Sequence, residues 1–294
     1  MPKISIILPT YNVEPYIERA LQSCINQTFK DIEIIVVDDC GNDKSIEIAK
    51  DYAKKDERIK IIHNEKNLGT FASRNIGVLN SNSGGGYVMF LDPDDYLELN
   101  ACEICLINIK DNNLLQFGFK KNENSEIDLI YPKMKDYKEF KKYISYFYFI
   151  PWNLCSLMIK RDFFCKKIQN FDYKFVYAED MLVYISLINE KMIFIKDCLY
   201  NYIIHESSIS QENNEKYNTY LANLDFTLSM IEKMDLSKNI LRYYSYFIKM
   251  NIYQFLYKSH KISYLKYKFL KKKEKIKKKY YILLFKISKL RRHN

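Results

Sequence analysis

The stretch ISIILPTYNVEPYIERALQSCINQTFKDIEIIVVDD, residues 4–39, contains two strand-like segments separated by one helix-like segment. Its two ends, ISIILP (4–9) and IEIIVV (32–37), are short apolar runs, as expected for strands buried on both faces of a parallel sheet. Between them, apolar residues recur every three or four positions from Ile17 to Ile25, which is the spacing of an amphipathic helix. The stretch therefore predicts a strand–helix–strand unit with a right-handed parallel crossover.

The same alternation continues for about a hundred residues. Helical spacing is found in residues 42–56 and 71–81, and apolar strand-like runs occupy residues 59–63 and 87–91. Repeats of this length predict an α/β fold with an open, Rossmann-like, mostly parallel sheet flanked by helices. Further along, LLQFGF and NLCSLMI are expected to be strands, a helix is expected to start at Glu179 or Asp180, and the chain reads as helical from about residue 214.

Polar side chains follow each of the first four predicted strands. Ligands of such sheets bind beyond the carboxyl ends of the strands, so these residues are expected to share one rim. The rim residues are Thr10 and Asn12, then Asp38 and Asp39, then Asn64 and Asn67, and finally Asp92 and Asp94.

The fourth of these strands ends in three carboxylates. In YVMFLDPDDYL, residues 87–97, Asp92, Asp94 and Asp95 fall within four positions, and mutual repulsion would raise their pKa values unless something compensates it. Mg²⁺ or Mn²⁺ would compensate it, because these ions prefer oxygen ligands and commonly bind carboxylates together with substrate phosphates. Pro93 stiffens the turn. The alternative is an ordinary solvated turn at a strand end.

Three segments together resemble one protein family. Residues 4–43, 64–77 and 87–97 are similar, in order and spacing, to the donor-binding half of family 2 glycosyltransferases with the GT-A fold. The resemblance covers about residues 3–100 and continues more weakly to about residue 210. It implies inverting transfer of a sugar from a nucleotide-diphosphate donor, classically a UDP-sugar, to a glycan acceptor in surface-glycan or lipid-linked-glycan assembly.

The resemblance also implies roles for individual residues of the donor site. Asp39 would hydrogen-bond the base, and Arg74 would approach the diphosphate or the sugar. Asp92 and Asp94 match the D-x-D motif, with Asp94 the firmer ligand of Mn²⁺ or Mg²⁺. The remaining expected donor-binding residues are Pro9, Thr10, Asn12 and Asn67.

Residues outside the first hundred would complete the site. The family carries a Glu-Asp pair with the Asp as catalytic base, and Asp180 of VYAEDMLVY matches it, although either acid could instead cap a helix. His205 is a candidate for the metal shell or the diphosphate, against an ordinary exposed histidine. Trp152 and Glu179 are weaker candidates for the acceptor side, with core packing the alternative for the tryptophan.

Charge is distributed unevenly along the chain. Residues 241–294 contain 17 Lys and Arg and one acid, Glu274, whereas the remaining residues contain 29 basic and 35 acidic ones. From about residue 258, Lys is interleaved with Tyr, Phe, Ile and Leu, which favours a basic helix lying on an anionic membrane over a solvated tail. Nucleic acid is not an expected partner, because no groove-reading motif is present.

The compartment is suggested by cysteine usage. Seven Cys in apolar contexts, among them a lone C-x-x-C at Cys102 and Cys105 that we interpret as structural, indicate a reducing environment. The first apolar run is too short for a signal peptide. We therefore expect a cytoplasmic protein, peripheral on the inner face of the cytoplasmic membrane.

The predicted organisation has two parts. Residues 1–210 would form the glycosyltransferase domain, with the nucleotide-sugar side in 1–100 and the acceptor side in 101–210, and residues 211–294 a helical region with the basic tail. Two other functions remain open. A haloacid-dehalogenase-type phosphatase also uses D-x-D, but after its first strand, and a non-enzymatic membrane or polyanion adaptor would leave the rim residues unexplained.

Overall fold

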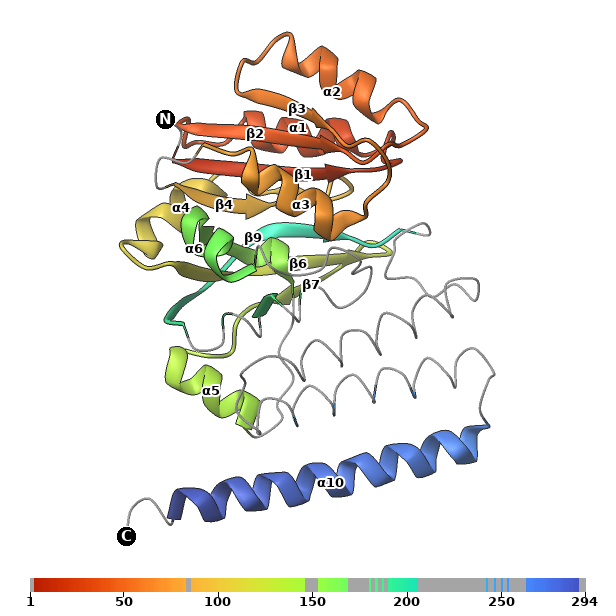
Figure 1. Ribbon diagram of the computed structural model, residues 1–294, viewed down its shortest axis with the longest axis vertical. Helices are drawn as coiled ribbons and strands as arrows, with labels where there is room; N and C mark the ends of the chain where they lie inside the picture. Colours follow the sequence, from red (N-terminus) through yellow and green to blue (C-terminus); the bar gives the residue numbers. More distant parts are fainter. Residues whose placement is uncertain are drawn as a thin grey trace. The chain divides into compact units, whose positions relative to one another are not determined.

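The fold is an α/β arrangement built on one large sheet, followed by helices (Figure 1). The strands that the structure describes lie in the order β3-β2-β1-β4-β8-β6-β9-β5, with β7 paired to β6. The computed structural model describes residues 3–82, 86–145, 153–168, 180, 183–184, 187, 190–205, 242, 246, 250, 253 and 263–290.

The first half of the sheet is parallel, as the sequence predicts. Its strands are β1 (Ile4–Thr10), β2 (Ile32–Asp38), β3 (Ile59–His63) and β4 (Tyr87–Phe90), and β1 pairs in parallel with both β2 and β4. The crossovers contain α1 (Ile17–Ile25), α2 (Ser45–Ala53) and α3 (Thr70–Leu79). Every residue of β1 is buried, which accords with its mostly apolar sequence.

The second half of the sheet is mixed. β8 (Leu157–Lys160) runs antiparallel to both β4 and β6 (Leu114–Glu123), whereas β9 (Met192–Ile203) runs parallel to β6. Two short antiparallel strands complete it, β5 (Tyr96–Leu97) against β9 and β7 (Glu126–Ile130) against β6. The helices of this half are α4 (Ala101–Ile109), the 3₁₀ turn η1 (Leu154–Ser156) and α6 (Arg161–Ile168).

One predicted strand needs correction. The segment NLCSLMI is a strand only from Leu157, because Asn153 accepts the backbone N–H of Cys155 at 2.9 Å and so caps the short turn η1 before the strand begins. This turn places Cys155 and Ser156 beside the end of β4, where the site described below is built.

Close packing fixes α3 on the sheet. A Cβ atom added to Gly77 would lie 2.4 Å from Cγ2 of Ile7, so only glycine allows the helix to approach β1 this closely. In Figure 1, α3 and α6 cover the same face of the sheet, and the two helices contact each other. Because α3 follows β3, its first turns stand at the carboxyl ends of the parallel strands, and they carry Arg74.

The chain divides into two compact units. One contains residues 1–137 and 151–208, and therefore the whole sheet; the other contains residues 138–150 and 209–294. The second unit includes α10 (Tyr264–Leu290), so the basic segment predicted to be helical is a helix over these residues. Among the residues that the structure describes, no helix is long and apolar enough to cross a membrane.

Candidate active site

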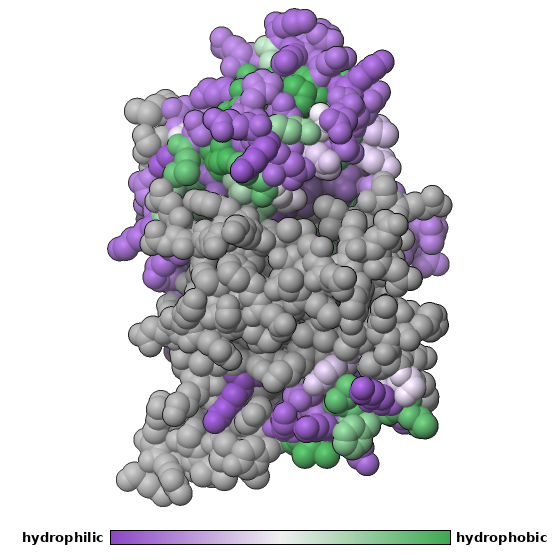
Figure 2. All heavy atoms as spheres, turned by 45° about the vertical axis from the view of Figure 1, so that its right-hand side comes forward, coloured by the Kyte–Doolittle hydropathy of each residue, from purple (hydrophilic) through white to green (hydrophobic). Residues whose placement is uncertain are grey.

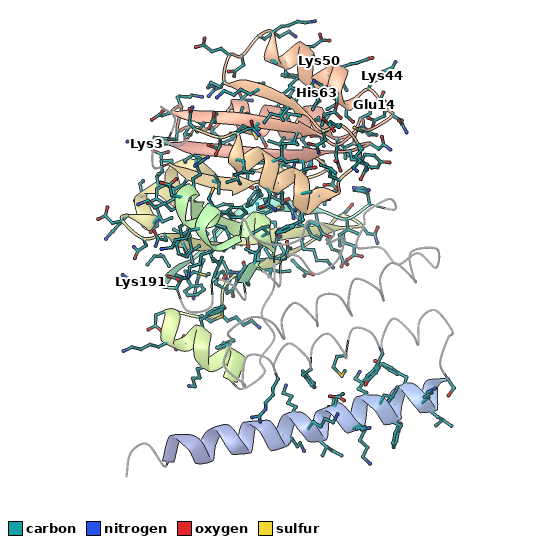
Figure 3. The ribbon with its side chains drawn as sticks, in the orientation of Figure 1. Lys3, Glu14, Lys44, Lys50, His63 and Lys191 are labelled. Atoms are coloured by element: carbon teal, nitrogen blue, oxygen red, sulfur yellow. The ribbon has the colours of Figure 1, made fainter. Side chains whose placement is uncertain are left out.

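The candidate site lies at the carboxyl ends of the parallel strands. His63 is the last residue of β3 and Glu14 follows β1, and both stand at this edge in Figure 3, whereas Lys3 stands at the opposite one. A side-chain hydrogen bond joins the loops that follow β1 and β2: Asn12 Oδ1 accepts the N–H of Asn42 at 2.7 Å. The predicted convergence of strand ends is thus present in the first unit.

Asp39 organises the loop between β3 and α3. Its carboxylate is 3% exposed and accepts hydrogen bonds from Asn64 Nδ2, from the N–H of Leu68 and from the N–H of Gly69, each at 2.8 Å. Gly69 has a φ of +87°, a left-handed conformation that glycine adopts without strain. A carboxylate has about four lone-pair sites, so Asp39 retains capacity for a further donor such as the edge of a base.

Removing the charge of Asp39 should therefore loosen this loop. In Asp39→Asn an amide N–H replaces one acceptor and faces backbone donors, and a buried unsatisfied donor costs about 1–3 kcal/mol. Urea unfolding should show a loss of that size. Asp51→Asn, an exposed carboxylate paired with Lys54, serves as the control and should change the free energy of unfolding by less than about 0.5 kcal/mol. Equal stability of the two variants would contradict this role of Asp39.

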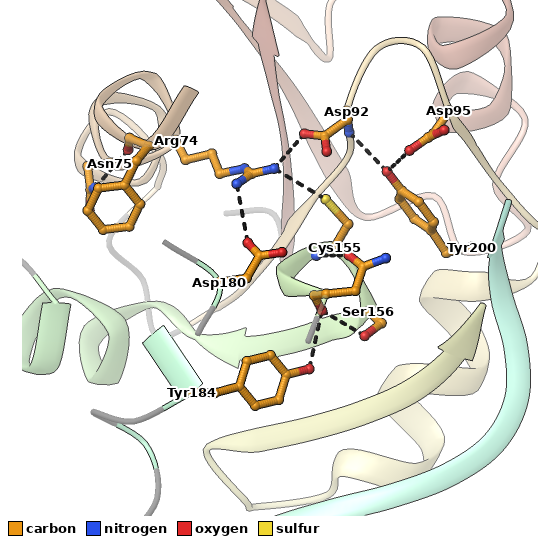
Figure 4. Close-up of polar contacts among 11 residues, drawn as sticks. Arg74, Asn75, Asp92, Asp95, Cys155, Ser156, Asp180, Tyr184 and Tyr200 are labelled. Carbon is orange, nitrogen blue, oxygen red and sulfur yellow. Dashed lines mark hydrogen bonds and ion pairs between the residues drawn. The ribbon is translucent and has the colours of Figure 1, made fainter. Parts of the chain in front are cut away.

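A buried arginine joins two of the predicted carboxylates. Arg74 of α3 is 3% exposed, and its guanidinium donates to Asp92 Oδ1 at 2.6 Å and lies 3.6 Å from Asp180 Oδ1 (Figure 4). The same guanidinium lies 3.6 Å from Cys155 Sγ and over the ring of Phe90. Arg74 thus links the end of β4 to the segment that carries the predicted base.

Burial and charge oppose each other at Asp180. Burial raises the pKa of this carboxyl above its ordinary value and Asp92 adds to the rise, while Arg74 and the N–H of Leu154 lower it. Its side chain is 30% exposed as a whole, although Oδ1, the oxygen nearest Arg74, is itself inaccessible. A carboxylate with a raised pKa at an accessible position is suited to accept a proton.

Asp94 faces a histidine rather than the arginine. Its Oδ2 lies 3.1 Å from Nε2 of His205, whose ring stacks on Tyr16 with centroids 4.5 Å apart. Its backbone oxygen accepts from Arg19 at 2.6 Å. Burial raises the pKa of Asp94, and the charge of Asp92 raises it further, although His205 lowers it. Negative charge at this position is therefore only partly compensated.

The third carboxylate of the turn is the most deeply buried. Asp95 is 1% exposed, and its oxygens accept from the hydroxyl of Tyr200 at 2.5 Å and from the N–H of Ile203 at 2.7 Å. Burial raises its pKa to about 9, with contributions from Asp94 and Asp92. Tyr200 also accepts the N–H of Asp92 at 3.3 Å, so one tyrosine touches both ends of the turn.

The structure brings together most of the predicted site residues. Asp92, Arg74 and Asp180 form one connected group, and Asp94 pairs with His205. Thr10 donates to the carbonyl of Leu8, Pro9 is buried within β1, and Asn67 is exposed in the loop that Asp39 holds. Trp152 and Glu179 lie outside the described residues.

Sequence reasoning did not assign several residues of this site. Cys155, Tyr200 and Arg19 carry no motif: the cysteine is one of seven and Tyr200 is one of 26 tyrosines, so only their neighbours in space reveal them. The sequence shows Asp95 as the third acid of the turn, but it does not predict that this side chain points into the protein rather than toward the rim.

Comparison with known proteins defines the family. The model of the family described as "Glycosyl transferase family 2" matches residues 5–164, and the chain belongs to this family. It is 32% identical over 223 residues to the "Uncharacterized glycosyltransferase EpsJ" of Bacillus subtilis, covering 72% of this chain and 64% of EpsJ. It is 29% identical over 287 residues to the "GalNAc(5)-diNAcBac-PP-undecaprenol beta-1,3-glucosyltransferase" of Campylobacter jejuni, covering 88% and 87%.

Solved structures confirm the fold. Staphylococcus aureus TarS 1–349, in complex with UDP-GlcNAc, has a TM-score of 0.62 at 22% identity and covers 86% of this chain and 71% of its own. The mannosyltransferase PcManGT from Pyrobaculum calidifontis, in complex with GDP-Man and Mn²⁺, has a TM-score of 0.59 at 14% identity, with 87% and 72% covered. The predicted GT-A-type fold is thus confirmed, and its mostly parallel sheet is curled.

Proposed function

We propose that this protein transfers a sugar from a UDP-sugar, with inversion, to a hydroxyl group of a glycan acceptor. The observation that carries the proposal is the joined group Asp92–Arg74–Asp180, which puts a cationic side chain between a predicted diphosphate-side carboxylate and a predicted base. Membership of the family supports a transferase over a phosphatase or an adaptor. UDP as the carrier is supported by the UDP-GlcNAc complex of TarS.

The residues at the end of β4 fit a divalent cation. Carboxylate oxygens of Asp94 and Asp92 and the imidazole of His205 are ligands that Mn²⁺ accepts, and Mg²⁺ accepts the oxygens. The partly compensated charge of Asp94 favours a cation there. Among the described residues no three acidic, histidine or cysteine side chains are already arranged as a metal cage, so the donor phosphates would supply further ligands. When bound, the ion would supply Lewis-acid stabilisation of the charge on the leaving diphosphate.

The protein's own residues would do the rest. The loop held by Asp39, with Pro9, Thr10, Asn12 and Asn67, binds the nucleotide. Arg74 is held in place by two carboxylates, so its charge lies close to the diphosphate without a cost of ordering the side chain. Asp180 takes the proton from the acceptor hydroxyl, the one proton transfer that a single inverting displacement needs on the acceptor side.

The acceptor proposed is a lipid-linked glycan. The name of the Campylobacter relative specifies an undecaprenol diphosphate-linked acceptor, and the match runs over most of both chains. Trp152 and Glu179 remain proposed acceptor residues. Residues 1–100 and 101–210 remain the proposed donor and acceptor sides.

A donor panel tests the proposed reaction directly. UDP release is measured from UDP-glucose, UDP-galactose, their N-acetyl forms and, as a non-UDP comparison, GDP-mannose, each with Mn²⁺. We expect release from at least one UDP-sugar and rates near background with GDP-mannose. Phosphate release from simple phosphate esters without any UDP release would instead favour the phosphatase reading, and no turnover together with vesicle binding would favour the adaptor.

We further propose that α10 places the enzyme on an anionic membrane. Leu265, Phe269 and Ile276 are 76%, 66% and 59% exposed, and their spacing of four and seven residues sets them on one helix face. Exposed lysines surround this face, and Figure 2 shows apolar and hydrophilic side chains next to one another on the helix. The opposite face contains the buried Glu274, so the helix packs within its own unit and presents the apolar stripe outward. The flanking exposed lysines are Lys266, Lys268, Lys272, Lys273, Lys275 and Lys279.

Point substitutions test the membrane proposal better than removal of the tail, because α10 also packs inside its unit. We expect the triple variant Leu265→Ser, Phe269→Ser, Ile276→Ser to lose most binding to anionic vesicles in a sedimentation assay, and wild-type binding to weaken with salt, since each lysine contributes about 1 kcal/mol near such a surface. Ile127→Ser with Leu129→Ser, equally exposed residues on β7, should have no effect. Unchanged binding of the triple variant would refute this docking face.

This arrangement gives the proposed location its physical basis. Residues 258–294 would hold the enzyme at the inner face of the cytoplasmic membrane, where a lipid-linked acceptor is present at high local concentration.

A further inference from the structure

A buried hydrogen-bonded bridge ties the carboxylate turn to the end of β9. Asp95 directly follows Asp94, but its side chain turns inward, where Tyr200 and Ile203 donate to its two oxygens. Both Asp95 and Tyr200 are essentially inaccessible, with exposures of 1% and 0%. Neither side chain can touch the sugar donor or the glycan acceptor, so the proposed reaction does not explain this pair.

The bridge extends the pairing of two strands by side-chain bonds. β5 pairs with β9 through Tyr96 opposite Asn201 and Leu97 opposite Tyr200. Asp95, the residue before Tyr96, is not part of this backbone pairing. The carboxyl group of Asp95 then accepts the N–H of Ile203, where a backbone carbonyl would otherwise be needed. The turn is thus held against β9 up to the point where β9 ends.

Two predicted cation ligands, Asp94 and His205, lie next to this bridge in the sequence. Asp94 precedes Asp95 by one residue and His205 follows Ile203 by two, and their side chains meet at 3.1 Å. At the other end of the turn, Tyr200 accepts the N–H of Asp92. One buried pair therefore fixes the backbone of Asp92, of Asp94 and of the segment leading to His205.

We propose that Asp95 and Tyr200 are positioning residues that set the geometry of Asp94 and His205 and do not themselves contact substrate. The inference rests on the proposed function for its consequence, binding of Mn²⁺ with UDP, but not for its geometry. Buried groups that fix the orientation of ligands typically change metal affinity by about 10–100-fold when they are altered.

Tyr200→Phe is the test, because it keeps the ring and removes only the hydroxyl that joins Asp95 to Asp92. Tyr87→Phe is the matched control: its hydroxyl is hydrogen-bonded too, but as a donor to the backbone carbonyls of Lys110 and Asn112, at the far end of β4. Two readouts are taken on the full-length folded protein. One is the imidazole NMR signals of His205 without metal, assigned with His205→Asn among the four histidines. The other is the affinity for Mn²⁺ in the presence of UDP.

We expect Tyr200→Phe to shift the His205 signals and to weaken Mn²⁺ binding about tenfold, and Tyr87→Phe to do neither. In the double variant with Asp95→Asn the losses in affinity should be less than additive, because both substitutions break one bridge. A folded Tyr200→Phe with unchanged His205 signals would overturn the inference. Wild-type protein that binds no UDP would refute the proposed function instead, and the His205 signals would still decide the inference.

Discussion

Asp180→Asn should lower the turnover number by about 10²–10⁴-fold, the usual contribution of a positioned base, which corresponds to about 3–5 kcal/mol. Donor binding should stay close to wild type, because a base acts on the acceptor hydroxyl and not on the nucleotide. The amide keeps the size of the side chain and still presents an oxygen to Arg74, 3.6 Å away in the native protein. Turnover by UDP release with acceptor and donor affinity by calorimetry separate the two effects.

The pH dependence supplies a second check on Asp180. Because burial and the charge of Asp92 raise its pKa, the acidic limb of the rate profile should lie above the ordinary range of an aspartate, with activity lost as pH falls and the base becomes protonated. The limb should disappear from the residual activity of Asp180→Asn. Glu179→Gln is the control and should cost much less. Near-wild-type turnover, or loss of donor binding in Asp180→Asn, would exclude Asp180 as the base.

The parallel half of the fold could be predicted from local patterns alone. The apolar runs of β1 and β2 and the helical spacing between them are complete within residues 4–39, so no distant contact is needed to recognise them. β7 and β9 could not be predicted in this way. β7 alternates two acidic residues with apolar ones but is exposed along almost its whole length, so it buries no apolar face, and β9 mixes polar and apolar residues. Both depend on pairing with β6, which sequence periodicity does not report.

The candidate site shows the same division. The strand-end position of Asp39, Asp92 and Asp94 follows from the order of elements, so the sequence places them on one rim. Their partners do not follow from it. From the sequence, a cation is expected to compensate the charge of the three carboxylates. In the structure, Arg74 is hydrogen-bonded to Asp92, and Tyr200 is hydrogen-bonded to Asp95. Packing of α3 on the sheet and the position of β9 within it make these contacts, across separations of 18 and 105 residues.

Asp94 is the carboxylate on which a metal requirement should depend most. Asp92 is paired with Arg74, and Asp95 is turned into the protein and 1% exposed, which leaves Asp94, partly compensated by His205, as the carboxylate of the turn best placed to attract a cation. Asp94→Asn keeps the size of the side chain and its contact with His205 but removes the charge that attracts a cation. We expect turnover to fall by about 10²–10³-fold, the size of effect seen when one stabilising group at a developing negative charge is lost.

Excess EDTA should lower the wild-type rate to a similar level, and added Mn²⁺ should restore the wild type but not Asp94→Asn. Asp128→Asn, an exposed carboxylate on β7, controls for a general effect of charge and should behave as wild type. The metal role is rejected if the EDTA-treated wild type keeps full activity. If EDTA inactivates the protein but Asp94→Asn does not lose activity, the ion is held by other ligands, and the match of this turn to the D-x-D motif does not identify the metal site.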